Sequence, residues 1–540
     1  MSWIRRQRKW ELATATLLTV VAGLIAFTFM DYGVTVDEQH SANNGKYFLN
    51  WYASGFTDHT INTEGNHYLY GSFVNAVTEI AARGSPFGPF ETSHLLIAMT
   101  GLLGIFFAWR TARMLGGPMA GFLSAAILTL TPVYYGHMFM NPKDIPFAVL
   151  FLMTVYYLLT AYDRLPKLPT RSVAPLGIVI GLTLGIRIGA IMLFGYCVVL
   201  VIFWILARYA RSPSYRIREA IADLRPIALS LLKVGAIAWA IMLGWWPYAQ
   251  LSPILNPLRA FRRAANFTDF PATVLFDGRF IPANALPWNY LPTSFAIGLP
   301  EFYAISIVAG VIALIPAVFF RRGETAGIDA DSAARIAFLV FAILFPLMAA
   351  IVMRPILYDA NRHFLFVIPL LAVLAGVSFA TLFRSRVPAT VKTVVAGVAV
   401  LVAVSTVRDM RRLHPYQYVF YNQLSNGLPG ALGRYETDYW GQSHKEGMDW
   451  LIANYRPGAP PASIRVANTA VDFQTSYYLQ RGGVSTARFT PVGKREQPHI
   501  ILSITRWNAH LNRPGRVLHV VGRRGTPLLY VVELRPYIPK

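Results

Sequence analysis

Residues 12–30 read LATATLLTVVAGLIAFTFM, an apolar run that follows the basic segment RRQRK at residues 5–9 and precedes the acidic pair Asp37-Glu38. A helix needs about 20 apolar residues to span a bilayer. The run is too long for the core of a signal peptide, and no Ala-x-Ala cleavage site follows it. It therefore predicts an uncleaved first span whose N-terminus lies in the cytoplasm.

The composition agrees with a membrane protein. Of the 540 residues, 54% are hydrophobic and only 14% are charged, whereas soluble domains carry about 25% charged residues. The formal charge of +22 comes with no nucleic-acid-binding motif, so we expect no nucleic-acid partner. Instead, the charge is typical of basic cytoplasmic loops. The single cysteine, Cys197, excludes an intrachain disulfide and a cysteine-rich metal site.

Ten further apolar segments follow, and with the first they predict about eleven transmembrane helices. They begin near residues 94, 118, 145, 173, 189, 227, 297, 334, 362 and 389. The segments at 173 and 189 share one long apolar stretch, which we divide around Arg187.

The loops that this count places in the cytoplasm are all basic, as the positive-inside rule requires. Their charged residues are Arg110 and Arg113; Arg164, Lys167 and Arg171; Arg208, Arg211, Arg216, Arg218 and Arg225; Arg321 and Arg322; Arg384 and Arg386. An odd number of spans places everything after residue 407 outside the cytoplasm. In a Gram-negative bacterium that side is the periplasm.

The sequence therefore predicts a polytopic α-helical membrane protein with a C-terminal soluble α/β domain. Residues 1–407 form the transmembrane module, with long outer loops at 31–93 and 248–296. Residues 408–540 form the periplasmic domain, because Gly and Pro punctuate short runs of alternating character there. We expect a helix at 445–455 and strands at 463–467, 499–503, 517–521 and 528–534.

The acidic pair Asp37-Glu38 lies a few residues beyond the first span, at the predicted membrane–water interface. A carboxylate there meets both a water-soluble acceptor and a lipid headgroup, so it suits a general base. A solvated helix cap explains the same pair without any catalytic role. Spacing alone does not say whether Asp37 or Glu38 is the base.

The second outer turn packs four polar residues close together between two apolar segments. Lys143 suits binding of a phosphate, and Asp144 suits a group that orients the lysine or the base. His137 and Asn141 would support them. The alternative is a plain turn with Asp144 at the start of a helix.

Cations gather at two further places on the predicted outer side. Arg187 interrupts an apolar stretch close to the outer face, where an anionic headgroup offsets the cost of a charge near the bilayer. The loop before the segment at 362 holds the other candidate phosphate contacts and one supporting residue, namely Arg354, Arg362, His363 and Tyr358. A carboxylate base and several cations on one side suit an enzyme with a lipid-phosphate substrate, because a fixed cation stabilises the departing phosphate.

An Asp-Glu pair just after the first span resembles the GT-C glycosyltransferases that use polyprenyl-phosphate sugars. The closer likeness is to the protein O-mannosyltransferase and aminoarabinose-transferase branch, which is similar to glycosyltransferase family 39. Residues 137–146 (HMFMNPKDIP), 181–189 and 358–366 resemble segments of that branch. The likeness covers roughly residues 10 to 405.

The resemblance implies an inverting transfer in which Asp37 matches the catalytic carboxylate and Glu38 its neighbour. It also implies that Lys143, Arg187 and Arg362 contact the donor phosphate. The C-terminal domain does not resemble the β-trefoil insert of eukaryotic mannosyltransferases, which puts a serine or threonine acceptor in doubt. Some members of the branch bind a metal and others need none. No ligand set in this sequence compels one, so we predict no metal site and no cofactor and leave a divalent metal open.

We therefore expect transfer of a sugar from a polyprenyl phosphate to a protein, lipid or glycan of the envelope, on the periplasmic face of the inner membrane. The partners are the lipid-linked sugar, membrane lipid and that acceptor. One alternative is a transporter or flippase of lipid-linked sugars, which needs polar groups through the bilayer, and few are found. A second is a non-enzymatic assembly factor, for which Asp37 and Glu38 would be dispensable.

Overall fold

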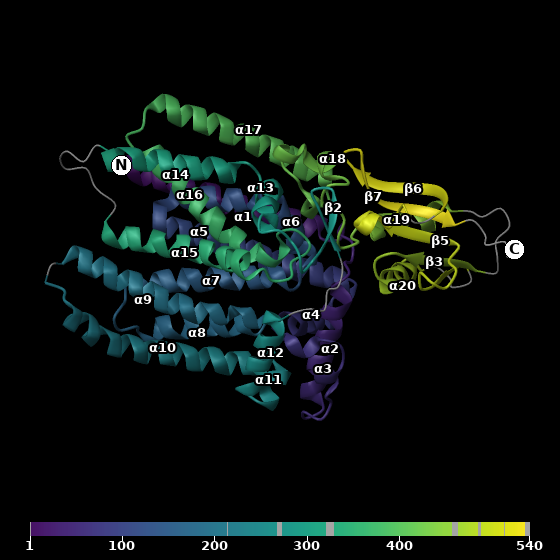
Figure 1. Ribbon diagram of the computed structural model, residues 1–540, viewed down its shortest axis with the longest axis horizontal. Coiled ribbons are helices and arrows are strands. Elements are labelled where there is room, and N and C mark those ends of the chain that lie inside the picture. Colours follow the sequence, from purple (N-terminus) through teal and green to yellow (C-terminus); the bar gives the residue numbers. More distant parts are fainter. Residues whose placement is uncertain are drawn as a thin grey trace.

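The computed structural model describes residues 2–212, 214–266, 273–319, 329–455, 463–483, 488–511 and 514–534. A bundle of long helices carries the C-terminal domain at one end, and the N-terminus lies near the opposite end (Figure 1). We call the end of the bundle next to this domain the domain side. The candidate site residues gather there.

Eight helices of the described residues are long and apolar enough to cross a membrane, or nine if a bent pair is one span. The eight contain α1 (Ser2–Thr28), α5 (Pro89–Thr129), α7 (Asp144–Tyr162), α9 (Met192–Arg211), α10 (Ile217–Trp245), α15 (Ala330–Met353), α16 (Ile368–Arg384) and α17 (Ala389–Leu413). The bent pair is α13 (Tyr290–Gly298) and α14 (Phe302–Phe319), which meet at 97°.

The prediction of about eleven spans differs from this count of long apolar helices for two physical reasons. First, α5 contains two predicted segments, interrupted at Gly117, where φ is 76°. The Ser124 hydroxyl donates to the Ala108 carbonyl at 3.3 Å, whereas a straight helix would separate these residues by about 24 Å. The two arms thus fold back on each other. Second, α8 (Thr170–Leu184) has only 15 residues, too few to span alone.

Some of the predicted basic loops lie together at the end of the bundle opposite the domain. Arg113 contacts Glu11 at 2.6 Å, and Arg211 forms an ion pair with Asp331. Arg321 and Arg322 fall outside the described residues.

The first long loop folds into its own helices on the domain side. It contains α2 (Glu38–Ala53), α3 (Thr60–Thr63), η1 (His67–Leu69) and α4 (Phe73–Gly84). Its backbone packs tightly on the bundle, because a Cβ on Gly71 would lie only 1.8 Å from the Gly185 carbonyl oxygen. Glycine is required at this approach, which brings the loop against the segment that carries Arg187.

The other domain-side connections are shorter. Between α5 and α7 lies α6 (Pro132–Met140), between α8 and α9 lies η2 (Ile188–Ile191), and η3 (Arg362–Val367) precedes α16. The loop after α10 contains α11 (Pro247–Leu251), α12 (Leu255–Ala265), β1 (Thr273–Phe276) and β2 (Arg279–Pro282). Here β1 and β2 pair antiparallel.

The C-terminal domain is a five-stranded mixed sheet of order β4-β3-β5-β7-β6. The strands are β3 (Ile464–Asn468), β4 (Phe489–Pro491), β5 (Ile500–Ile504), β6 (Gly515–Arg523) and β7 (Thr526–Leu534), with helices α19 (His444–Asn454) and α20 (Asp472–Arg481). β3 runs parallel to β4 and β5, and β7 antiparallel to β5 and β6. Arg524 and Gly525 both have positive φ, as a two-residue hairpin turn requires.

The α/β character predicted for this part is confirmed, although β4 and α20 were not foreseen. Between α17 and the sheet the chain forms η4 (Gln417–Val419), η5 (Gln423–Ser425) and α18 (Gly427–Ala431). The domain is interlocked with the bundle loops. A Cβ on Gly33 would lie 2.2 Å from the Gln442 carbonyl oxygen, and the Tyr478 hydroxyl accepts a bond from the Val34 amide at 2.7 Å.

Candidate functional site

Asp37 lies at the N-terminus of α2, and its side chain is 40% exposed. Its Oδ2 accepts a hydrogen bond from Nη1 of Arg362 at 3.2 Å. Burial acts to raise the pKa of Asp37, but the charges of Arg362 and Lys143 outweigh it, and the pKa lies below its ordinary value. Asp37 is therefore an ionised carboxylate that a ligand can reach.

Glu38 points into the protein. Only 2% of it is exposed, and its Oε2 accepts bonds from the amide of Thr35 at 2.6 Å and from its hydroxyl at 3.0 Å. Oε1 lies 2.8 Å from Nε2 of His94 in α5. Both carboxylate oxygens are thus occupied, and they tie the start of α2 to the bundle.

Arg362 is buried among three carboxylates at the start of η3. Its guanidinium lies 3.0 Å from Asp359 and 3.2 Å from Asp37, with Asp144 at 3.8 Å. It also stacks over the rings of Tyr358 and Trp440, at 5.1 and 4.8 Å from their centroids. The arginine is already neutralised by these partners, so its clearest effect is to hold Asp37 in place.

The second outer turn supplies a buried chain of hydrogen bonds. The Asn141 side-chain amide donates to Asp144 at 2.9 Å and lies 3.2 Å from Nδ1 of His137. Nε2 of His137 lies 3.0 Å from the hydroxyl of Tyr439, which belongs to the C-terminal domain. The other carboxylate oxygen of Asp144 forms an ion pair with Arg187. This chain fixes the start of α7 and the arginine beside it.

Lys143 is the best-placed cation for an anionic ligand. Its ammonium lies over the ring of Tyr70, 4.1 Å from the centroid, and it is only partly buried. Among the described residues, no carboxylate forms an ion pair with it. Arg187 is 26% exposed and also borders the open side of the cluster.

Two histidines beside Asp37 were not predicted. His40 and His67 stack with ring centroids 3.8 Å apart. Burial, together with the charge of Lys143, lowers the pKa of His40 to about 3 and that of His67 to about 4, so both are neutral at pH 7. The signal for His40 was its position three residues after Asp37, which places both on one helix face.

The structure does not bring Arg354 into the cluster. It is an exposed residue at the C-terminus of α15, with φ of 48°, and it borders a separate small pocket with Trp288. The nearby candidates do join the cluster. Nε2 of His363 lies 3.4 Å from Nη2 of Arg362, and the rings of Tyr358 and His363 meet edge to face.

Sequence analysis missed the contribution of the C-terminal domain to this cluster. Arg506 contacts Asp359 at 2.6 Å, and the Trp440 indole donates to the same carboxylate at 3.1 Å. No sequence signal points to Arg506, since it lies 147 residues from Asp359.

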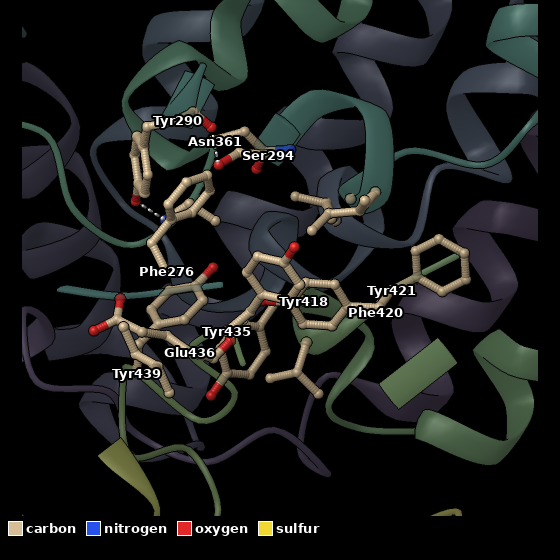
Figure 2. A pocket seen from close by; sticks show the side chains of 16 residues that line it. Phe276, Tyr290, Ser294, Asn361, Tyr418, Phe420, Tyr421, Tyr435, Glu436 and Tyr439 are labelled. Atoms are coloured by element: carbon tan, nitrogen blue, oxygen red, sulfur yellow. Dashed lines mark hydrogen bonds between the residues drawn. The ribbon is translucent and has the colours of Figure 1, made fainter. Parts of the chain in front are cut away.

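A cavity of about 30 Å³ adjoins the cluster between the bundle and the domain. Figure 2 shows its lining of tyrosines together with Ser294, Asn361 and Glu436. Burial raises the pKa of Glu436 to about 7, with Arg506 opposing the shift. A cavity of this size holds one or two water molecules.

Among the described residues, no group of three or more His, Cys, Asp or Glu side chains is arranged to hold a metal ion.

The fold and the site define a class of protein. It is a polytopic membrane protein with a half-exposed carboxylate and cations at one end of its bundle, under a soluble domain. Residues 88–239 match the family model described as dolichyl-phosphate-mannose-protein mannosyltransferase. The resemblance predicted from the motifs is confirmed by this match.

Solved structures are similar to this chain over most of its length. ArnT from Cupriavidus metallidurans in the apo state matches with a TM-score of 0.50 at 16% identity, over 96% of this chain and 97% of that chain. ArnT bound to undecaprenyl phosphate matches with a TM-score of 0.49 at 15% identity and the same coverage. The apo oligosaccharyltransferase of Archaeoglobus fulgidus gives 0.47 at 12% identity, over 90% of this chain and 65% of that chain. No match was found among curated protein sequences.

Proposed function

We propose that the protein transfers a sugar from a polyprenyl phosphate to an acceptor hydroxyl, with inversion at the anomeric carbon. The observation that carries this proposal is that an ionised, half-exposed Asp37 and Lys143 lie together on the domain side of a membrane bundle, and that no carboxylate of the described residues forms an ion pair with Lys143. The family match over residues 88–239 supports a polyprenyl-phosphate sugar as the donor.

Asp37 is the base. Its carboxylate accepts a hydrogen bond from the acceptor hydroxyl and takes the proton as the hydroxyl oxygen attacks the anomeric carbon. The bond from that carbon to the phosphate oxygen breaks on the opposite face, and its electron pair leaves with the phosphate. Arg362 holds the carboxylate at 3.2 Å throughout. Glu38 positions α2 and takes no proton, because both of its oxygens are occupied.

Lys143 and Arg187 bind the donor phosphate. Negative charge grows on the phosphate as the glycosidic bond breaks, and fixed cations stabilise that transition state. The lipid chain lies among the apolar helices. The basic loops at the opposite end favour a periplasmic position for the domain side, and we expect the acceptor to be a protein, lipid or glycan of the envelope.

The test compares strains that carry the wild-type protein, Asp37→Asn or no protein, with the two proteins at equal membrane abundance. Mass spectrometry measures envelope glycans and lipid-linked sugars. Asp37→Asn should lose the same glycan as the deletion and accumulate a polyprenyl-phosphate sugar. Wild-type glycans in Asp37→Asn, with loss only in the deletion, would favour a transporter or an assembly factor.

A further inference from the structure

One arginine of the C-terminal domain reaches the candidate site on the domain side of the bundle. Arg506 begins η6 (Arg506–Asn508) and is 7% exposed. Its Nη2 contacts Oδ1 of Asp359 at 2.6 Å, and its Nη1 donates to the Tyr439 carbonyl at 2.7 Å. Asp359 is only 1% exposed. This is a fully buried ion pair between two parts of the chain that are far apart in sequence.

The other oxygen of Asp359 is shared. Oδ2 lies 3.0 Å from Nη2 of Arg362 and accepts the Trp440 indole N–H at 3.1 Å. The carboxylate therefore divides its charge between an arginine of the domain and an arginine of the bundle. Because Arg506 occupies one oxygen, Arg362 keeps its second nitrogen, Nη1, for Asp37 at 3.2 Å.

We infer that Arg506 is a positioning residue for Asp37, acting through Asp359 and Arg362, so that the C-terminal domain completes the active site instead of only binding the acceptor. The inference rests on the proposed function of Asp37. It assigns a role to a residue that touches neither donor nor acceptor.

The physical reason is the cost of an unpaired buried charge. Without Arg506, Oδ1 of Asp359 has lost its ion pair inside the protein, which is strongly unfavourable. Arg362 is the cation already in contact with Asp359, and it would turn toward this oxygen and away from Asp37. Removing both members of the pair avoids that penalty, because no uncompensated charge remains.

Asp37 reports this change through its protonation. The groups that face it are Arg362 from η3, Lys143 and Asp144 from the start of α7, and His40 from α2. Arg362 is the strongest of the groups that favour the ionised form. Its withdrawal therefore raises the pKa of Asp37 and increases the protonated fraction at mildly acidic pH.

The experiment measures the labelling rate of Asp37 by dicyclohexylcarbodiimide in the full-length protein in nanodiscs at pH 6, with peptide mass spectrometry. The reagent reacts with the protonated carboxyl group and becomes attached as an acylurea. Because the rate follows the protonated fraction, a rise of one pKa unit gives about a tenfold faster reaction. The variants are Arg506→Met, the double variant Arg506→Met with Asp359→Asn, and the control Arg523→Met. Arg523 is a partly buried arginine of the same domain, paired with Glu446 at 2.7 Å.

We expect Arg506→Met to speed labelling of Asp37 several-fold, and the double variant to return it to the wild-type rate or below. Arg523→Met should not change it. An unchanged rate in folded Arg506→Met, or a fast rate that the double variant fails to reverse, would overturn the inference. The labelling needs no sugar transfer, so a negative result leaves the proposed function standing. Conversely, if Asp37→Asn keeps the wild-type glycans, the proposed function is contradicted whatever the labelling rates are.

Discussion

At the start of α2 the chain places two neighbouring carboxylates in opposite environments. Asp37 is 40% exposed and faces Arg362, whereas Glu38 is buried and bonded to Thr35 and His94. Successive residues of a helix point about 100° apart, so one faces the open cluster and the other faces the bundle. The sequence could place the pair at the interface but could not divide the roles, since that depends on His94, which is 56 residues away.

Replacing Glu38 tests its structural role. Glu38→Ala removes the carboxylate that contacts the Thr35 amide, the Thr35 hydroxyl and His94. It should lower the free energy of unfolding by about 1–3 kcal/mol. Thermal denaturation in detergent measures the effect. Glu64→Ala in the same loop is the control, because Glu64 is exposed and substitution of an exposed residue changes stability by at most about 0.5 kcal/mol. Equal stability of the two variants would contradict this role.

Lys143 is predicted to act on both the donor and the base. Lys143→Met should weaken binding of undecaprenyl phosphate by about 10- to 100-fold, since a hydrogen bond to a charged group contributes about 1.5–3 kcal/mol. Lys143 also helps to lower the pKa of Asp37, and the base works only above its pKa. Without Lys143 that pKa rises, and activity should be lost at a higher pH as the medium is acidified.

Titration with undecaprenyl phosphate and initial rates between pH 4 and 8 check both effects. Lys46→Met, which replaces an exposed lysine of α2, should behave like the wild-type protein. Unchanged binding by Lys143→Met would remove this residue from the phosphate site.

At the scale of elements, the site depends on loops that the hydropathy pattern leaves undefined. The apolar segments were foreseen because each is long and lacks charge, and the start of α7 was foreseen from its polar turn. The helices of the first loop were missed, since their amphipathic faces are short. The break in α5 at Gly117 was predicted as the boundary between two spans. Arg354 was predicted as a phosphate contact but lies outside the cluster. It is itself the left-handed residue at the end of α15, where the chain turns away from the cluster.

The contact of the first loop with the bundle predicts the effect of one methyl group. Gly71→Ala places a Cβ about where the Gly185 carbonyl oxygen lies, so the loop must move away from the segment that carries Arg187. We expect a clear fall in melting temperature and a loss of activity beyond that expected from stability alone. Gly84→Ala in the same loop is the control, because nothing lies within 4 Å of its added Cβ. Similar behaviour of the two variants would show that the close approach is absent.

At the scale of the whole molecule, the domain and the bundle form one site. Composition and strand pattern predicted an α/β domain, and the basic loops predicted which end of the bundle it covers. The contacts of Arg506, Trp440 and Tyr439 with the cluster could not be predicted, because they arise only when segments distant in sequence are docked. The domain residues that contact the site can therefore be identified only from the folded structure.

Glu436 makes the stability of this interface depend on pH. Its folded pKa is raised to about 7, so its contribution to stability is present below the unfolded value near 4.5 and is lost as pH rises through about 7. The melting temperature of the wild-type protein should fall between pH 5 and 7 relative to that of Glu436→Gln. Parallel melting curves across this range would contradict the buried, largely protonated state of Glu436.

The most direct test of sugar transfer uses the lipid that Asp37→Asn is expected to accumulate. This lipid is extracted and added to purified protein in liposomes with the acceptor fraction of the deletion strain, and free polyprenyl phosphate is measured over time. We predict that the wild-type protein releases polyprenyl phosphate while the sugar appears on the acceptor, and that Asp37→Asn releases none. Release by Asp37→Asn at the wild-type rate, or no release by the wild-type protein, would contradict transfer from a polyprenyl phosphate with Asp37 as the base.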